Sequence, residues 1–320
     1  MDKTEKIELL KKIANKHKMR ATKAGEDAVI GFASDMDVGV KKWAYFDIPI
    51  LDDVTGGIPA GQFSVVAGPE KGGKSTLVAR AIANVQRSGG VAAFVDAEGQ
   101  LDPLWMEKQG VNMEELFVVD DSFLEPALDR VRELLDSKAV DIMVVDSITA
   151  LGSMKEMKDK EGIRSLAKDT IALQARKIAQ FFRVSVGLVK KAECAMILIA
   201  QIRIDPMSFG SFEEIPGGNA LKHYCSMRLR VRRGAKEYAP KTQVPYIDGH
   251  GKEKKRETVV GFRCVIQLDK KRSTRAAMEG TEVALPFWFD DGFRDGEKCA
   301  ILKGENKKLE DIAERQEEIW

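Results

Sequence analysis

The stretch that decides the fold is FSVVAGPEKGGKSTLVARAIANVQ, from Phe63 to Gln86. Its first residues form a continuous apolar run that predicts a buried strand, and LVARAIANVQ predicts a helix. Between them, GPEKGGKST fits the pattern G-x-x-x-x-G-K-[ST]. In such a turn, the backbone N–H groups and the N-terminus of the following helix hold phosphate groups. A glycine-rich turn that matches by chance is the alternative, and the strand before it and the helix after it argue against that alternative.

The chemistry of this turn assigns its residues to a nucleotide. Lys74 is expected to reach the β- and γ-phosphate oxygens, and Ser75 to hold Mg²⁺. Glycines at 68, 72 and 73 allow close approach of the backbone to the phosphates. The predicted nucleotide-binding residues of the turn are Gly68, Pro69, Glu70, Lys71, Gly72, Gly73, Lys74, Ser75 and Thr76.

The rest of the chain alternates short apolar runs with helical segments. The runs are FSVVAG, VAAFVDAE, LFVV, VDIMVVD, CAMILIA, CSMRLRVRR, VGFRCVIQLD and TEVALPFWF. Continuous apolar strands separated by helices predict an α/β fold with a mostly parallel sheet flanked by helices, and the last three runs alternate more, which predicts an antiparallel extension.

Polar residues stand where these predicted strands end, which is where open α/β sheets bind ligands. Asp146 ends VDIMVVD and is predicted to help hold Mg²⁺, although it could instead cap the next helix. Asp96 and Glu98 end the run FVDAE, and spacing alone does not decide which of them orients the attacking water. Gln201 ends AMILIAQ, where a neutral amide can contact a γ-phosphate or can simply be a satisfied polar residue.

The amino-acid composition indicates which cellular compartment to expect and whether net charge favours a particular binding partner. The 320 residues are 44% hydrophobic, enough for one large core, and 51 Lys+Arg against 50 Asp+Glu leave a net charge of +1, so bulk charge names no partner. The four cysteines are widely spaced, which predicts buried thiols in a reducing compartment. With no signal peptide and no membrane span expected, the predicted location is cytoplasmic.

GPEKGGKST, FVDAEGQLDP, VDIMVVDSITAL and AQIR followed by GGNALKHY occur in an order and spacing that resemble the bacterial RecA recombinase family. The resemblance covers about Thr4 to Phe293. The segment FFRVSVGLVKKAECAMILIAQ looks more like phage recombinases of the UvsX kind, which suggests a phage or divergent member.

The resemblance implies roles for further residues of the nucleotide site. Glu98 matches the catalytic glutamate, which makes Asp96 secondary, and Gln201 matches the γ-phosphate sensor. Asp102 and Trp105 match positions that hold and stack on adenine. Lys270 and Arg272 match a basic pair that reaches the ATP of the neighbouring subunit, with Lys271 between them leaving the register uncertain by one residue.

The resemblance also implies two DNA-binding loops, at about 154–168 and 203–218. The first is charged, and taken alone it would be read as a solvated helix face. The second contains apolar residues that could stack on bases, although Asp205, Glu213 and Glu214 are acids near expected phosphates. The predicted DNA-binding residues are Lys158, Lys160, Arg164, Lys168, Arg176, Arg203, Met207, Phe209, Phe212, Gly217, Gly218 and Asn219.

The resemblance implies three segments and one activity. In residues 1–36, apolar residues at helical spacing predict a helix from about Lys3 to Lys18 followed by a linker, and this helix could dock on its own core or on a neighbouring subunit; subunit docking is the expected role. Residues 37–289 are expected to form the ATPase core, and 290–320 a short C-terminal segment without a full C-terminal domain.

The expected function is ATP- and Mg²⁺-dependent strand exchange by a helical homo-oligomeric filament on single-stranded DNA, pairing with homologous duplex DNA. Single-strand-binding and mediator proteins are possible partners, and no membrane is expected. A hexameric DNA helicase and a non-recombining regulatory paralogue are the alternatives.

Overall fold

The chain divides into two compact units, Met1–Lys41 and Lys42–Trp320. A computed structural model describes residues 1–24, 30–32, 34, 40–149, 166–204, 213–214, 219–247, 252–272, 277, 279–294 and 299–303. The first unit contains helix α1 (Lys3–Ala24), which continues six residues past the end expected from the apolar spacing. The added residues MRATKA contain two alanines, the best helix former, so local propensity extends the helix beyond its apolar stripe.

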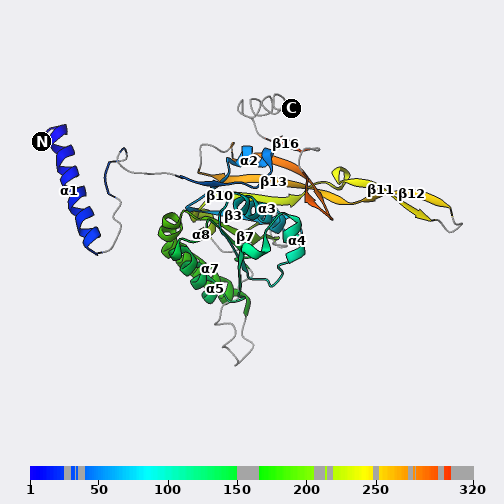
Figure 1. Ribbon diagram of the computed structural model, residues 1–320, viewed down its shortest axis with the longest axis horizontal. Helices are drawn as coiled ribbons and strands as arrows, with labels where there is room; N and C mark the ends of the chain where they lie inside the picture. Colours follow the sequence, from blue (N-terminus) through cyan, green and yellow to red (C-terminus); the bar gives the residue numbers. More distant parts are fainter. Residues whose placement is uncertain are drawn as a thin grey trace. The chain divides into compact units, whose positions relative to one another are not determined.

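The second unit is built on a ten-stranded sheet (Figure 1). Its strands run in the order β15-β14-β13-β10-β3-β7-β6-β4-β5, and β16 pairs with β14 off this path. All pairs from β10 to β5 are parallel, and the pairs of β13, β14, β15 and β16 are antiparallel. The strands are β3 (Gln62–Gly68), β4 (Ala92–Asp96), β5 (Leu116–Asp120), β6 (Ile142–Asp146), β7 (Ala195–Gln201), β10 (Cys225–Arg233), β13 (Gly261–Lys271), β14 (Glu282–Trp288), β15 (Gly292–Phe293) and β16 (Ala300–Lys303). The predicted fold class, a mostly parallel sheet with an antiparallel extension, is confirmed.

Helices cover the parallel part of the sheet because its central strands are apolar on both faces. Strand β7 is buried from Ala195 to Ala200, so each face needs a cover. One hydrophobic cluster joins the sheet to α2 and α3, and a second joins it to α5 and α7. The helices of this unit are α2 (Pro49–Thr55), α3 (Lys74–Arg87), α4 (Pro103–Lys108), α5 (Leu124–Ser137), α7 (Leu166–Ala192) and α8 (Asn219–Tyr224), with short 3-10 turns η2 (Met113–Glu115) and η3 (Lys236–Tyr238).

Strand β10 is the junction between the parallel and antiparallel parts. Leu229 is opposite Val66 of the parallel neighbour β3 and opposite Leu268 of the antiparallel neighbour β13. Its alternating arginines form ion pairs on one face, such as Arg232 with Glu282 at 2.9 Å. The alternation that predicted an antiparallel strand therefore reflects a strand with one apolar and one ionic face.

The parallel strands bring the predicted polar residues to one edge of the sheet. Asp96 is opposite Asp146 in the β4–β6 register, and Gly68 is opposite Gln201 in the β3–β7 register. Strand direction and register therefore place all four strand ends together.

Three two-stranded sheets and the cysteines complete the described structure. The small sheets pair β1 (Trp43–Ala44) with β2 (Ile58–Pro59), β8 (Arg203–Ile204) with β9 (Glu213–Glu214), and β11 (Lys241–Ile247) with β12 (Glu253–Val259). All four cysteines are free thiols; Cys194, Cys225 and Cys264 are buried as predicted, whereas Cys299 is only half-buried. Within the described residues, no helix is both long and apolar enough to cross a bilayer.

Candidate functional site

The turn after β3 has the backbone shape that its glycines predict. Gly73 has φ 96°, in the left-handed region that favours glycine, and α3 begins at the next residue, Lys74. At Gly68, an added Cβ would lie 2.1 Å from the carbonyl oxygen of Val231 in the adjacent strand β10. Gly68 is therefore required by the packing of the sheet, and Gly73 by the entry of the chain into the helix.

Arg233, a residue that the sequence did not single out, braces this turn. Its Nε and a terminal nitrogen donate to the carbonyl oxygen of Lys71 at 2.9 and 2.8 Å, and its guanidinium lies 4.4 Å from the centroid of the Phe262 ring. Lys71 has φ 55°, an uncommon conformation for a residue with a side chain. The paired donors hold that residue in place, so the end of β10 supports the loop from outside.

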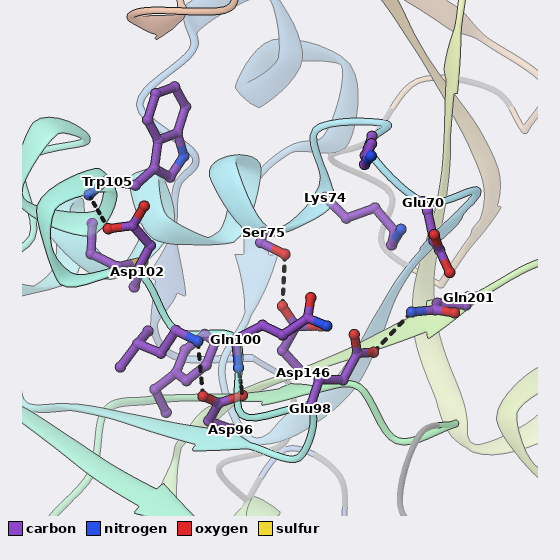
Figure 2. Close-up of a pocket in the computed structure, with 14 residues that line it drawn as sticks. Glu70, Lys74, Ser75, Asp96, Glu98, Gln100, Asp102, Trp105, Asp146 and Gln201 are labelled. Atoms are coloured by element: carbon purple, nitrogen blue, oxygen red, sulfur yellow. Dashed lines mark hydrogen bonds between the residues drawn. The ribbon is translucent and has the colours of Figure 1, made fainter.

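The side chains of Lys74, Ser75 and Asp146 meet at the centre of the pocket, as Figure 2 shows. The Ser75 hydroxyl donates to Asp146 Oδ2 at 2.6 Å, and Lys74 Nζ donates to the Pro69 carbonyl at 2.7 Å. Burial raises the pKa of the Asp146 carboxyl to about 6, against the opposing effect of the Ser75 hydrogen bond. Burial also lowers the pKa of the Lys74 ammonium, partly offset by Asp146 and Glu98. For both groups, the cost of removing the charge from water is larger than the attraction between the two opposite charges.

Glu98 and Asp96 have different surroundings. Glu98 Oε1 accepts from the Gln201 amide at 2.9 Å (Figure 2). The same oxygen accepts from the Ser147 hydroxyl at 2.6 Å. Asp96 accepts from the backbone N–H groups of Gln100 and Leu101 at 3.2 and 2.9 Å. Asp96 therefore shapes the loop after β4, while Glu98 faces the pocket and the end of β7. This geometry favours Glu98 over Asp96 for contact with a reacting water.

Asp102 and Trp105 form the opposite end of the same pocket from Gln201 (Figure 2). Asp102 is the N-cap of α4, and its Oδ1 accepts from the backbone N–H of Trp105 at 3.1 Å. The Trp105 indole Nε1 donates to the Thr76 hydroxyl at 3.1 Å, which ties α4 to the first turn of α3. An indole held in this way offers a flat apolar surface at the far end from Gln201.

The pocket fits a nucleoside triphosphate with Mg²⁺. The backbone amides at the start of α3 and the Lys74 ammonium suit phosphate oxygens. The Ser75 hydroxyl and the Asp146 carboxylate are adjacent oxygen donors, the ligand type that Mg²⁺ prefers. The half-buried Asp146 carboxyl has a raised pKa because its charged form is poorly solvated, so a bound cation would stabilise that form. Elsewhere in the described parts of the chain, no cluster of three or more His, Cys, Asp or Glu side chains offers a rival metal site.

Other predicted site residues lie outside this pocket. Lys270 and Arg272 are not among its lining residues: Lys270 Nζ donates to the Lys222 carbonyl, and Arg272 donates to the His223 carbonyl at 2.6 Å, at the end of α8. Arg176 is an exposed residue of α7.

The predicted DNA-binding loops fall mostly outside the described residues. Lys168 lies in α7, Arg203 in β8, and Asn219 begins α8. Glu213 and Glu214 form β9, which pairs with β8, so these two acids belong to a short ladder at the base of the second loop. The predictions that fall outside the described residues are Lys158, Lys160, Arg164, Asp205, Met207, Phe209, Phe212, Gly217 and Gly218.

Sequence reasoning missed three residues that support the site. Arg233 braces the loop, Ser147 donates to Glu98, and the hydroxyl of Thr149 accepts from the Gln201 backbone N–H at 3.2 Å. Ser147 and Thr149 directly follow the strand-end Asp146, and their position after a ligand-bearing strand was the available signal. Arg233 had no such signal, because its partner lies 162 residues away in the sequence.

The sheet order and the phosphate-binding turn define the class of P-loop proteins with a RecA-like core. A model of the RecA N-terminal domain family matches residues 13–279, and the chain belongs to the RecA family. It is similar to Protein RecA of Allochromatium vinosum, with 45% identity over 179 residues that cover 56% of this chain and 50% of the relative. It is also similar to Protein RecA of Azospirillum lipoferum (strain 4B), with 38% identity over 218 residues, 68% of this chain and 55% of the relative.

A solved structure supports the fold. The crystal structure of the RadB recombinase matches with a TM-score of 0.54 and 21% identity, covering 79% of this chain and 100% of that chain. The matched regions of the curated relatives amount to about half of their own length.

Proposed function

We propose that this chain is an ATP- and Mg²⁺-dependent DNA strand-exchange protein that assembles as a helical filament on single-stranded DNA and pairs it with homologous duplex DNA. Membership of the RecA family supports this proposal. The observation that carries it is the 2.9 Å hydrogen bond from Gln201 to Glu98. It joins a pocket suited to ATP to the strand end that leads, through β8, into the predicted second DNA loop.

In the proposed reaction, Lys74 holds the β- and γ-phosphate oxygens, and Ser75 and Asp146 hold the metal. Bound Mg²⁺ would neutralise charge that develops on the phosphates. Glu98 orients the attacking water and accepts its proton. Trp105 stacks on the base, and Asp102 lies beside it.

Gln201 couples the nucleotide to DNA in this proposal. Its amide can donate either to Glu98 or to a γ-phosphate, so contact with the phosphate would release Glu98 Oε1 for water. The same movement would shift β8 and the loop residues that follow it. DNA bound to the loop would, by reciprocity, favour the arrangement in which Glu98 is released.

The remaining parts complete the filament. Residues 1–36 dock on a neighbouring subunit, and 37–289 carry the ATPase core. Lys270 and Arg272 reach the ATP of the adjacent subunit from the end of β13, and Arg272 stabilises charge on the transferred phosphate. The loops at 154–168 and 203–218 bind single-stranded DNA through cations and stacking side chains. Single-strand-binding and mediator proteins are proposed accessory partners.

The test measures ATP turnover with and without single-stranded DNA, together with strand invasion of a homologous duplex and electron microscopy of the same mixture. We expect DNA to stimulate wild-type turnover, Lys74→Ala to remove turnover, and Gln201→Ala to retain ATP binding but lose the stimulation. Turnover that is indifferent to DNA in the wild type would refute the coupling. Closed hexameric rings without filaments would favour a helicase, and nucleotide binding without DNA binding would favour a regulatory paralogue.

A further inference from the structure

The hairpin β11–β12 is a separate element of the second unit that the proposed nucleotide site does not use. Its two strands pair with each other from Lys241 opposite Val259 to Ile247 opposite Glu253, and they form their own two-stranded sheet. Figure 1 shows the hairpin extending away from the ten-stranded sheet. Seven residues a strand make it about 24 Å long. Side chains on both of its faces are exposed, so the hairpin is built to present a surface and not to fill the core.

The two faces of this hairpin differ in charge. Side chains alternate between faces along each strand, so the register assigns every described residue to one side. On the balanced face, Lys241 pairs with Glu257 at 3.1 Å, and Glu253 offsets Lys255. The described residues of the opposite face, here termed the basic face, are Thr242, Val244, Tyr246, Lys254, Arg256 and Thr258. Two cations and no acid stand on the basic face as described.

Each cation of the basic face stands directly across from an apolar side chain. Arg256 is opposite Val244, and Lys254 is opposite Tyr246. Val244 and Tyr246 remain 38% and 41% exposed, so the cations do not cover them. The two cations alternate along one strand and are therefore about 7 Å apart. The basic face thus offers positive charge and apolar contact together over a narrow ribbon.

We propose that the basic face of the β11–β12 hairpin binds the backbone of duplex DNA. Duplex DNA is a dense polyanion, and its major groove, about 12 Å wide, admits a two-stranded ribbon. A site for single strands would need a series of aromatic side chains for stacking, and the described basic face has only Tyr246. This inference rests on the proposed function for the identity of its ligand, and it names the element that holds the duplex during pairing.

The test compares two double variants of the full chain that remove equal charge from opposite faces. Lys254→Gln with Arg256→Gln alters the basic face, and Lys241→Gln with Lys255→Gln alters the balanced face. Binding of a fluorescent duplex of about 30 base pairs, which is longer than the ribbon, is followed by anisotropy without nucleotide over a range of salt. Both variants should keep the wild-type Tm and DNA-free ATP turnover.

Two lost phosphate contacts should make the slope of log affinity against log salt shallower by about 1.8 and weaken binding by up to about 60-fold near 0.1 M salt. The balanced-face variant should stay within about three-fold of the wild type, because a screened charge that makes no contact contributes little. Equal losses in both variants, no loss in either, or absence of wild-type duplex binding at about 50 mM salt would overturn the proposal. A loss seen with single-stranded DNA but not with duplex DNA would also overturn it.

The same variants separate this inference from the proposed function. If wild-type strand invasion is absent while duplex binding still depends on the basic face, the proposed function fails and the hairpin site stands. If strand invasion occurs and both variants bind duplex DNA like the wild type, the hairpin site fails and the proposed function stands.

Discussion

Replacing Asp146 with Asn should stabilise the nucleotide-free protein at neutral pH while removing its response to Mg²⁺ and ATP. Burial raises the pKa of Asp146 from 3.8 to about 6. A carboxyl whose pKa is higher in the folded protein than in the unfolded protein stabilises the fold at a pH below the unfolded-state pKa. This stabilisation is lost as the pH rises through the folded-state pKa. The full loss is about 3 kcal/mol, from roughly 2.2 pKa units at 1.36 kcal/mol each. Asn carries no charge at any of these pH values and keeps an oxygen for the Ser75 hydroxyl, so its stability should not fall.

The measurement is urea unfolding with EDTA at a series of pH values. Between about pH 4.5 and 7.5, the stability of Asp146→Asn relative to the wild type should rise by about 2 kcal/mol. Asp120→Asn, which alters an exposed carboxylate at the end of β5, two strands away from β6 in the sheet, is the control and should show no such trend. Addition of Mg²⁺ and ATP at pH 7.5 should stabilise the wild type and not Asp146→Asn. If the difference in stability between Asp146→Asn and the wild type stays constant or narrows with rising pH, Asp146 is not a desolvated charge that a bound cation would stabilise.

Three further substitutions test how the pocket is built. Gly68→Ala should destabilise the fold by about 3 kcal/mol or more in urea unfolding, because its Cβ would lie 2.1 Å from the Val231 carbonyl oxygen. The control is Gly187→Ala in α7, where no atom lies within 4 Å of the added Cβ, and this variant should be more stable than the wild type by up to about 1 kcal/mol. Arg233→Lys should weaken ADP binding about ten-fold in a fluorescence titration, because a lysine cannot supply the paired donors to the Lys71 carbonyl. The control is Arg263→Lys, because the Arg263 guanidinium lies over Tyr238, and equal ADP affinities in both variants would contradict the bracing role of Arg233. Trp105→Phe should keep a stacking ring and lose only the hydrogen bond to Thr76, so calorimetry should show ATP binding weaker by about 1 kcal/mol. A loss above about 3 kcal/mol would show that the indole N–H has a role in ATP binding beyond this one hydrogen bond.

The sequence predicted the central sheet and the pocket because both depend on short segments with strong local signals. A continuous apolar strand, a glycine-rich turn and a helix are adjacent in the chain, so the position of Lys74 and Ser75 follows directly. The parallel arrangement of the strands then brings Asp146, Glu98 and Gln201 to the same edge without any knowledge of side-chain contacts. Spacing could not separate Asp96 from Glu98, because their difference lies in backbone amides that only the folded loop presents to Asp96.

Two features escaped prediction for different physical reasons. Arg233 supports the loop through a contact between distant segments, and such long-range contacts leave no local pattern. The β11–β12 hairpin has exposed strands of mixed composition, such as KTQVPYI and EKKRETV, with a proline in the first. Neither strand has the continuous apolar run that marks a buried strand, and a proline argues against strand structure except at an edge, where this hairpin places it.

The bond between Gln201 and Glu98 also limits how strongly DNA and nucleotide can be coupled. A hydrogen bond to a charged group contributes about 1.5–3 kcal/mol, which corresponds to roughly 10- to 150-fold in an equilibrium. Glu98 keeps its second donor, Ser147, when Gln201 leaves, so the carboxylate remains oriented and only one of its two bonds is exchanged. We therefore expect DNA stimulation of turnover through this bond to stay within that range, and Ser147→Ala to lower turnover with and without DNA by the same factor. A Ser147→Ala protein that lost only the stimulation would assign the coupling to Ser147 in place of Gln201.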